Sequence, residues 1–328
     1  MNNSTAYQDL DSSQASGTIQ IALYYLVIVL KVAINPTCAL IALFAAFVNI
    51  MTFLKMDLTQ GVNLSLFILS ASYLFLAILL ALGNVLKATL WLGLKNLAIV
   101  RLLLMGNRFG NFLNITAYVV TTTIAIFRCL SVAMPFKFSN LVTTRRQLVA
   151  IVMGCCVGFS VPIRTQILYY TAGTFSPVST VNLYIMDTFR KVFFFSCLAI
   201  IIVSTLYLTV ALRRSSRFQV TANTTTDSQS RTCKKKEVKV IKTVILVLTI
   251  FAACNVPLML LSALRLASID FTNSEQYQNA NLLVKMIIEL GASLNITLNT
   301  FVYLRYNTSF RAVVKKSLPC FFSSCSFT

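Results

Sequence analysis

Histidine is absent from the 328-residue sequence. Histidine is the commonest general base near neutral pH and a frequent metal ligand, so its absence excludes histidine bases, histidine pH switches and histidine metal sites. Acidic residues are also scarce, with nine Asp and Glu against 28 Lys and Arg. The sequence contains neither paired carboxylates nor a glycine-rich phosphate loop. We therefore expect a protein that is not an enzyme and that holds no metal or cofactor.

Charged residues of either sign make up only 11% of the sequence, whereas hydrophobic residues make up 57%, and the mean hydropathy is +0.78. A soluble domain cannot bury so much apolar surface. Several runs of about 20 apolar residues are long enough to cross a bilayer as helices. The short, alternating strands of a membrane barrel are not seen. The composition therefore predicts an all-α membrane protein.

Seven apolar runs divide the chain. They predict membrane-spanning helices at 33–55, 62–86, 102–131, 145–166, 189–213, 238–265 and 280–304. We expect an extracellular N-terminal segment at 1–32, a seven-transmembrane bundle at 33–304, and a short cytoplasmic amphipathic helix and tail at 305–328. A further apolar stretch precedes the first run, so the first helix either protrudes or breaks near Asn35-Pro36. A chain with eight spans is the alternative.

Positive charge is concentrated in alternate loops. The basic residues in these loops are Lys55, Lys137, Arg145, Arg146, Arg213, Arg214, Arg217, Arg231, Lys234, Lys235, Lys236, Lys239, Lys242, Arg305, Arg311, Lys315 and Lys316. Basic loops stay on the cytoplasmic side of a membrane, so this pattern places the N-terminus outside. The same charge attracts anionic lipid, which makes membrane lipid an expected partner and nucleic acid an unexpected one. Asn2 and Asn3 then lie outside, in sequons that permit glycosylation.

The third run ends in the motif IAIFRCLSVAMPFKFS, which places Arg128 and Cys129 shortly before Pro135. Further landmarks occur on other runs, namely Asn49, Tyr207, Phe251, Cys254, Pro257, Asn299, Tyr303 and Phe310. In residue type, order and predicted side of the membrane, this set resembles the landmarks of rhodopsin-like (class A) G protein-coupled receptors. The stretch FVNIMTFLKMDLTQGVNLSLF is similar, within that family, to the chemosensory receptor sets of gastropod molluscs.

The resemblance implies a plasma-membrane receptor that binds a small extracellular ligand, such as a chemosensory cue, in the outer half of the bundle. It also implies activation of a heterotrimeric G protein. The switch and coupling residues that it implies are Arg128, Tyr207, Phe251, Pro257, Asn299 and Tyr303. In the active state Arg128 would turn toward Tyr207 and Tyr303. The alternative for Arg128 is an interfacial arginine that simply reaches lipid phosphate.

The sequence departs from the family pattern at three informative positions. Phe127 replaces the acid that usually holds Arg128, so we expect raised basal activity or a different lock. Tyr73 replaces a buried aspartate, so we expect no bound sodium ion and a hydrogen-bonded phenol instead. The expected partner of that phenol is Asn49, Asn295 or Asn299. Asn255 replaces a tryptophan, and the sequence does not show whether it can take over the packing role of that side chain.

Polar residues in the outer half of the predicted bundle are costly there, which makes them candidates for ligand binding. The candidates are Arg108, Asn111, Asn114, Lys285 and Glu289. Glu289 is the single deep acid at this level, and basic residues outnumber it. We therefore expect a ligand with a carboxylate, or a zwitterion whose amine meets Glu289, and not a monoamine.

Two further segments are expected in the cytoplasm. The basic segment at 213–242 is rich in Ser, Thr and Lys and predicts a disordered loop. Cys320 and Cys325 follow the amphipathic segment and are candidates for palmitoylation, with free thiols as the alternative.

Two other functions compete with a coupling receptor. The degraded motifs are compatible with a receptor-shaped protein that binds a ligand without activating a G protein. A transporter or channel is less favoured, because such proteins often contain internal repeats and charged residues at the midplane, and we find no repeat here and almost no charge at that depth.

Overall fold

The computed structural model describes residues 21–58, 61–91, 93, 97–133, 143–171, 177–221, 228–267 and 278–317. Its elements after Val29 are the π-helical turn η1 (Leu30–Ile34) and the helices α2 (Asn35–Phe53), α3 (Gly61–Trp91), α4 (Leu97–Ala133), α6 (Thr144–Thr171), α7 (Pro177–Thr221), α8 (Ser228–Ala267), α10 (Gln278–Tyr306) and α11 (Thr308–Ser317). No strand occurs among the described residues, so the predicted all-α class is confirmed there.

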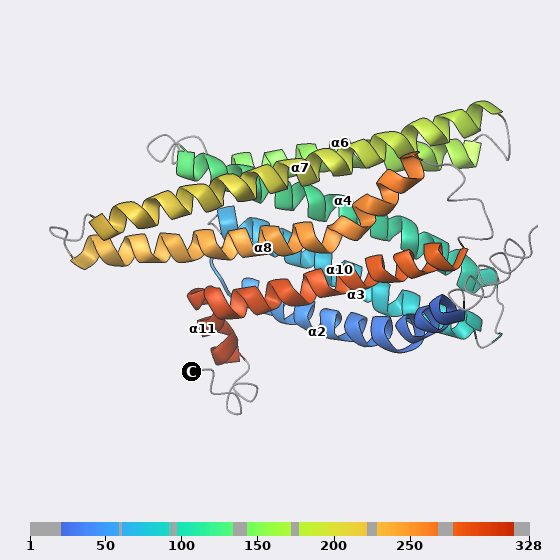
Figure 1. Ribbon diagram of the computed structural model, residues 1–328, viewed down its shortest axis with the longest axis horizontal. Helices are drawn as coiled ribbons and strands as arrows, with labels where there is room; N and C mark the ends of the chain where they lie inside the picture. Colours follow the sequence, from blue (N-terminus) through green and yellow to red (C-terminus); the bar gives the residue numbers. More distant parts are fainter. Residues whose placement is uncertain are drawn as a thin grey trace, which may run out of the picture.

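The long helices lie side by side along the longest axis of the molecule, and α11 turns across one end (Figure 1). Six of them form a closed ring, in which α2 packs on α3, α3 on α4, α4 on α7, α7 on α8, α8 on α10, and α10 on α2. Helix α6 packs against α3, α4 and α7. We call the end of the bundle that carries α11 the α11 end, and the other the opposite end.

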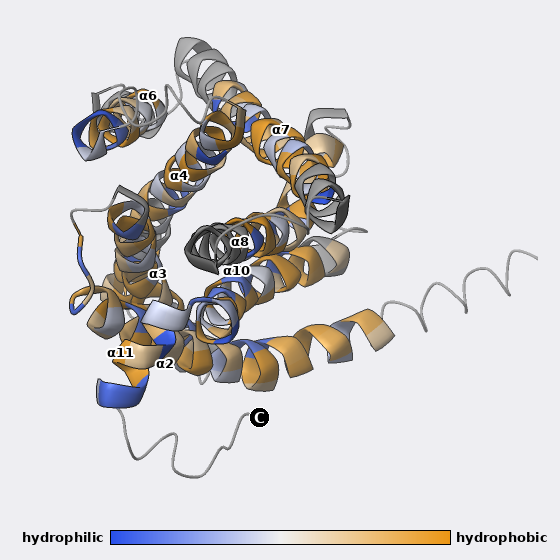
Figure 2. Cartoon of the chain, turned by 90° about the vertical axis from the view of Figure 1, so that its left-hand side faces the viewer, coloured by the Kyte–Doolittle hydropathy of each residue, from blue (hydrophilic) through white to orange (hydrophobic). Residues whose placement is uncertain are grey.

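Six described helices are long and apolar enough to cross a membrane: Ile21–Phe53, Asn63–Leu90, Phe109–Ala133, Thr188–Arg213, Ile241–Leu261 and Leu282–Tyr306. Their outward faces are apolar, as on α2, where Leu40, Phe44 and Phe47 expose 62%, 51% and 54% of their surface. Seen from the α11 end, the helices consist largely of hydrophobic residues, and hydrophilic residues lie on α11 and at the near end of α6 (Figure 2). So large an apolar exterior needs a lipid surrounding, and the chain is a multi-pass helical membrane protein.

The first helix differs from the sequence prediction. Residues 21–53 are continuously helical, so of the two alternatives the helix protrudes ahead of residue 33 and does not break at Asn35-Pro36. A proline ring clashes with the carbonyl four residues earlier in a regular α-helix. Here that carbonyl belongs to Val32, which lies within the wider π-helical turn η1. In this turn the Asn35 N–H donates to the Leu30 carbonyl. The helix therefore passes the proline and projects beyond the predicted span.

Two glycines allow α6 to pack closely on α4. Gly154 and Gly158 are four residues apart and lie on one face of α6. A Cβ added at Gly154 would lie 2.7 Å from Cγ1 of Val119, and one at Gly158 would collide with Cγ2 of Ile115. This spacing of small residues is the usual arrangement at closely packed membrane helices.

Helices also extend beyond the spans at the α11 end. Helix α7 continues to Thr221 and α8 begins at Ser228, so most of the segment predicted as a disordered loop is helical where the structure describes it. The predicted amphipathic helix is present as α11, with Phe310 and Val314 buried and Lys315 and Lys316 exposed. Interaction of its apolar side with the bundle explains why so short a helix is stable.

Candidate functional site

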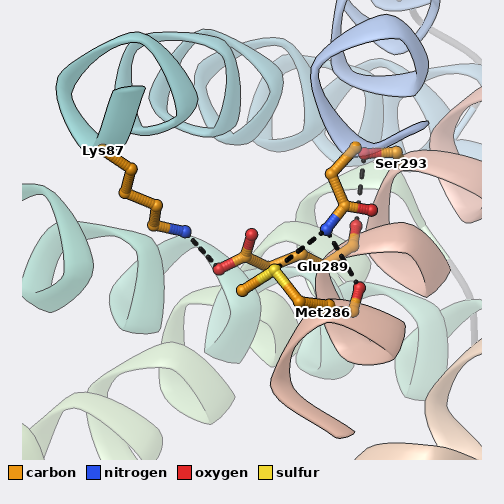
Figure 3. A network of polar contacts seen from close by, with 5 residues as sticks. Lys87, Met286, Glu289 and Ser293 are labelled. Atoms are coloured by element: carbon orange, nitrogen blue, oxygen red, sulfur yellow. Dashed lines mark hydrogen bonds and ion pairs between the residues drawn. The ribbon is translucent and has the colours of Figure 1, made fainter. Parts of the chain in front are cut away.

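An ion pair joins α3 and α10 in the half of the bundle away from α11. Lys87 Nζ donates a hydrogen bond to Glu289 Oε1 (Figure 3). The two side chains are 28% and 24% exposed. Lys87 lies four residues before the end of α3 at Trp91, and Glu289 lies in the first half of α10.

Neighbouring contacts hold this part of α10 in place. The amide nitrogen of Asn35 on α2 donates to the Met286 carbonyl at 3.2 Å and contacts the Met286 sulfur at 3.5 Å. The Ser293 hydroxyl donates to the Glu289 carbonyl at 3.2 Å. Met286, Glu289 and Ser293 are spaced by three and four residues and therefore share one face of α10. We call Lys87, Glu289, Asn35, Met286 and Ser293 the Lys87–Glu289 site.

Hydrogen bonding in this site is incomplete. Glu289 Oε2 and Asn35 Oδ1 are both buried and have no hydrogen-bond partner among the described residues. A buried acceptor without a donor costs about 1–3 kcal/mol. Charged groups inside a membrane bundle are themselves expensive and usually serve a function. The arrangement places the Lys87 ammonium, which has further N–H donors, beside Glu289 Oε2, an acceptor that has no donor.

The structure places the predicted ligand residues unevenly. Glu289 lies in the Lys87–Glu289 site, whereas Lys285, one turn earlier, is exposed. On α4, Asn111 is exposed and Asn114 is half-buried. The Arg108 side chain lies outside the described residues. The ion-pair partner of Glu289 is thus Lys87, which the sequence analysis missed, although a lone lysine within the apolar run LALGNVLKATLW was a visible signal.

A second cluster connects α4, α7 and α8 in the middle of the bundle. The Tyr118 hydroxyl donates to Asn255 Oδ1 at 2.9 Å, and Asn255 Nδ2 donates to the Phe251 carbonyl at 2.7 Å. The Tyr118 ring meets Phe251 edge-to-face at 4.9 Å and Phe194 at 4.7 Å between ring centroids. Asn255 therefore bonds across the bundle, two residues before the helix-interior Pro257. Tyr118 was not predicted, although its four-residue spacing from Asn114 puts both on one face.

A third cluster surrounds Tyr73 on α3. Asn295 Nδ2 donates to the Tyr73 hydroxyl at 2.9 Å, which confirms one of the predicted partners of this phenol. Asn299 Nδ2 contacts Asn295 Oδ1 at 3.4 Å. Asn49 bonds instead to the Thr300 hydroxyl, at 2.8 Å. Amide and hydroxyl groups thus occupy the place where the resemblance implied a carboxylate and a sodium ion.

Aromatic rings join the bundle to α11. Phe53, Tyr303 and Phe310 contact one another with centroid distances of 5.2–5.5 Å, and each is 0–1% exposed. Near this end, Arg128 is half-buried, and its guanidinium has neither a hydrogen bond nor an ion pair within the described parts of the chain. Tyr207 is 45% exposed and lies beside the buried Leu208 on α7.

Some predicted sites fall outside the described residues. These are the glycosylation candidates Asn2 and Asn3 and the palmitoylation candidates Cys320 and Cys325. The described helices and clusters define a multi-pass membrane protein with polar groups gathered inside an otherwise apolar bundle. No protein-family model matches the sequence, and no curated protein matches it either.

Proposed function

We propose that the chain is a rhodopsin-like G protein-coupled receptor of the plasma membrane. In this proposal α6 is the fourth of seven spans, the N-terminus is outside, and α11 lies on the cytoplasmic side. A small ligand binds in the half of the bundle that contains Glu289, and a heterotrimeric G protein binds at the α11 end. Chemosensory detection is the proposed role, by resemblance to the mollusc receptors.

The observation that carries this proposal is the convergence of residues that the motif resemblance had singled out from separate parts of the sequence. The landmarks in the core are Asn49, Phe251, Asn299, Tyr303 and Phe310, all at most 2% exposed, whereas Tyr207 is 45% exposed. Motif matches that arose by chance on separate helices would be expected to face lipid as often as the interior. Their joint burial supports a common packing arrangement with the family.

The contacts between these residues suggest a route from ligand to G protein. Tyr118 and Asn255 link α4 to α8 next to the proline of α8, where a helix bends most easily. The Tyr73 cluster lies farther along α10, and the Phe53, Tyr303 and Phe310 rings follow toward α11. The rings of these groups belong to one buried cluster, through which a change at the ligand end can alter helix packing at the other end.

Arg128 is the proposed switch, and among the described residues it has no acidic partner to hold it inactive. Removing a charged partner from the inactive state costs that state about 1–2 kcal/mol. This corresponds to an active fraction raised about tenfold. We therefore expect measurable signalling without ligand.

The test expresses the tagged chain, verifies surface display, and records basal G protein dissociation across a panel of Gα subtypes. Arg128→Ala and Phe127→Glu should both reduce the basal signal, the first by removing the switch and the second by restoring a partner for it. Arg101→Ala is the matched control, because Arg101 is an exposed arginine toward the opposite end of the same helix. If the wild-type chain is displayed but gives no basal signal with any Gα subtype, raised basal activity is refuted. The receptor-shaped, non-coupling alternative is then favoured.

A further inference from the structure

The Lys87–Glu289 pair is neutral as a whole but not saturated with hydrogen bonds. Lys87 donates one bond to Glu289 Oε1, although an ammonium group has three donors. Glu289 Oε2 is buried without a donor. The same few ångströms thus contain spare positive donors and a spare negative acceptor. A ligand that completes both sets must itself present an acceptor and a donor.

Charge restricts the ligand further. A simple amine would be attracted by Glu289 but repelled by Lys87 in direct contact with it, and a simple anion would meet the reverse conflict. A zwitterion meets neither conflict, because its carboxylate can face Lys87 while its ammonium faces Glu289. Charge-assisted hydrogen bonds of this kind are the strong ones in a site of low dielectric.

The direct contact of the two side chains sets the spacing of the ligand charges. Lys87 Nζ and Glu289 Oε1 are hydrogen-bonded, so the complementary groups of the ligand must also be adjacent. An α-amino acid carries both groups on one carbon. An ω-amino acid holds them several bonds apart, and a quaternary betaine has no N–H to offer Glu289 Oε2.

The surroundings are suited to hold such a head group. Asn35 is 2% exposed, and its Oδ1 is a second buried acceptor without a partner among the described residues, on the helix that bonds to Met286 in the same stretch of α10. About a quarter of each charged side chain is exposed, whereas Glu289 Oε2 itself is buried, so the ligand ammonium reaches Oε2 only when the carboxylate rotates. Ser293 bonds to the Glu289 carbonyl and thereby keeps its own hydroxyl proton away from the carboxylate.

We propose that the Lys87–Glu289 site binds the head group of a free α-amino acid, with the carboxylate at Lys87 and the ammonium at Glu289 Oε2. Lys87 is then a ligand-binding residue and not only a partner of Glu289. This inference rests on the proposed receptor function for its biological role, but binding itself is measured without a G protein.

The experiment uses the full chain purified into lipid nanodiscs and follows the thermal unfolding midpoint. The probes are the L-α-amino acids taken singly, each with its decarboxylated amine, its N-trimethyl betaine and, where one exists, its ω-amino isomer. We expect one or more α-amino acids to raise the midpoint and their three analogues to have no effect. Lys87→Gln and Glu289→Gln should each weaken the apparent affinity about tenfold or more.

Two further variants keep the test decisive. The double variant Lys87→Gln with Glu289→Gln retains a neutral, hydrogen-bonding pair, so it should fold even where a single variant does not. In this double variant the amino acid should no longer raise the unfolding midpoint. Lys31→Gln is the control for loss of a lysine, because Lys31 lies in η1, four residues before Asn35 of the site. The proposal is overturned if no α-amino acid shifts wild type, if the decarboxylated amine acts equally well, or if the shift persists in the double variant.

The same preparation separates this inference from the proposed function. Amino acid binding without any G protein turnover would refute the coupling receptor and leave the site intact. Basal G protein turnover that depends on Arg128, together with no amino acid binding, would refute the site and leave the receptor intact.

Discussion

Substituting Gly291 by alanine should force α10 and α8 apart where α8 contains its proline. A Cβ added at Gly291 would lie 2.8 Å from the carbonyl oxygen of Cys254, closer than the 3.0 Å limit that real Cβ contacts respect. The obstacle is backbone, so it cannot rotate away as a side chain does. Pro257 lies three residues beyond Cys254, in the same part of α8.

The expected effect follows from two opposing terms. Overpacking of a close contact costs about 1–3 kcal/mol. Alanine in place of glycine within a helix returns about 0.5–1 kcal/mol. The net loss is therefore between about 0 and 2.5 kcal/mol. Gly83 provides the matched control, because it is also within a helix and a Cβ there would have nothing within 4 Å. Gly83→Ala should keep the helical gain alone and stabilise the protein.

The assay is thermal unfolding in nanodiscs at one heating rate, followed with a thiol-reactive dye that reports exposure of the buried Cys197. The midpoint of Gly291→Ala should fall below wild type and that of Gly83→Ala should rise above it, for a separation of about 3 °C. Equal midpoints, or a more stable Gly291→Ala, would refute the close approach of α8 and α10.

Three further outcomes are expected. Tyr118→Phe leaves Asn255 Oδ1 without its donor, a loss of about 1 kcal/mol. If this hydrogen bond opposes activation, basal G protein dissociation should rise about fivefold. Unchanged basal signalling at equal surface display would show that the bond does not oppose activation. Phe310→Ala empties the centre of the aromatic contact with α11, should cost about 3–5 kcal/mol, and is measured as a lower unfolding midpoint. Tyr73→Phe leaves the Asn295 amide without its acceptor and should lower the midpoint modestly, while exchange of sodium for choline in the buffer should leave wild type unchanged.

The sequence was sufficient to predict those features that depend on local interactions or on contact with water or lipid. Asn299, Tyr303 and Phe251 were selected from short motifs, and all three are buried. The helices follow from the length of apolar runs, because a backbone in hydrocarbon must satisfy its own hydrogen bonds. The predicted spans at 33, 189 and 238 begin well inside longer helices, which are described from Ile21, Pro177 and Ser228. Passage of the first helix through Pro36 depends on the turn that precedes it.

Partnerships between distant residues were beyond the sequence. Lys87 and Glu289 are 202 positions apart, and Tyr118 and Asn255 are 137 apart. Nothing local to any of these residues specifies its partner, because the pairing depends on which helices are neighbours and on their rotation about their axes. The same is true of Gly291, which is an ordinary helical glycine until the backbone of α8 is placed against it.

The sequence by itself determined that this chain is a helical membrane protein, and the charge distribution predicted which way it faces. These properties arise from the transfer of side chains and peptide groups between water and lipid, which each segment experiences independently. Only the tertiary structure decided that Glu289 is neutralised by Lys87, that Asn255 bonds to Tyr118, and that Arg128 has no described partner. Those properties depend on contacts of a few ångströms between separate helices, which exist only after the bundle has packed.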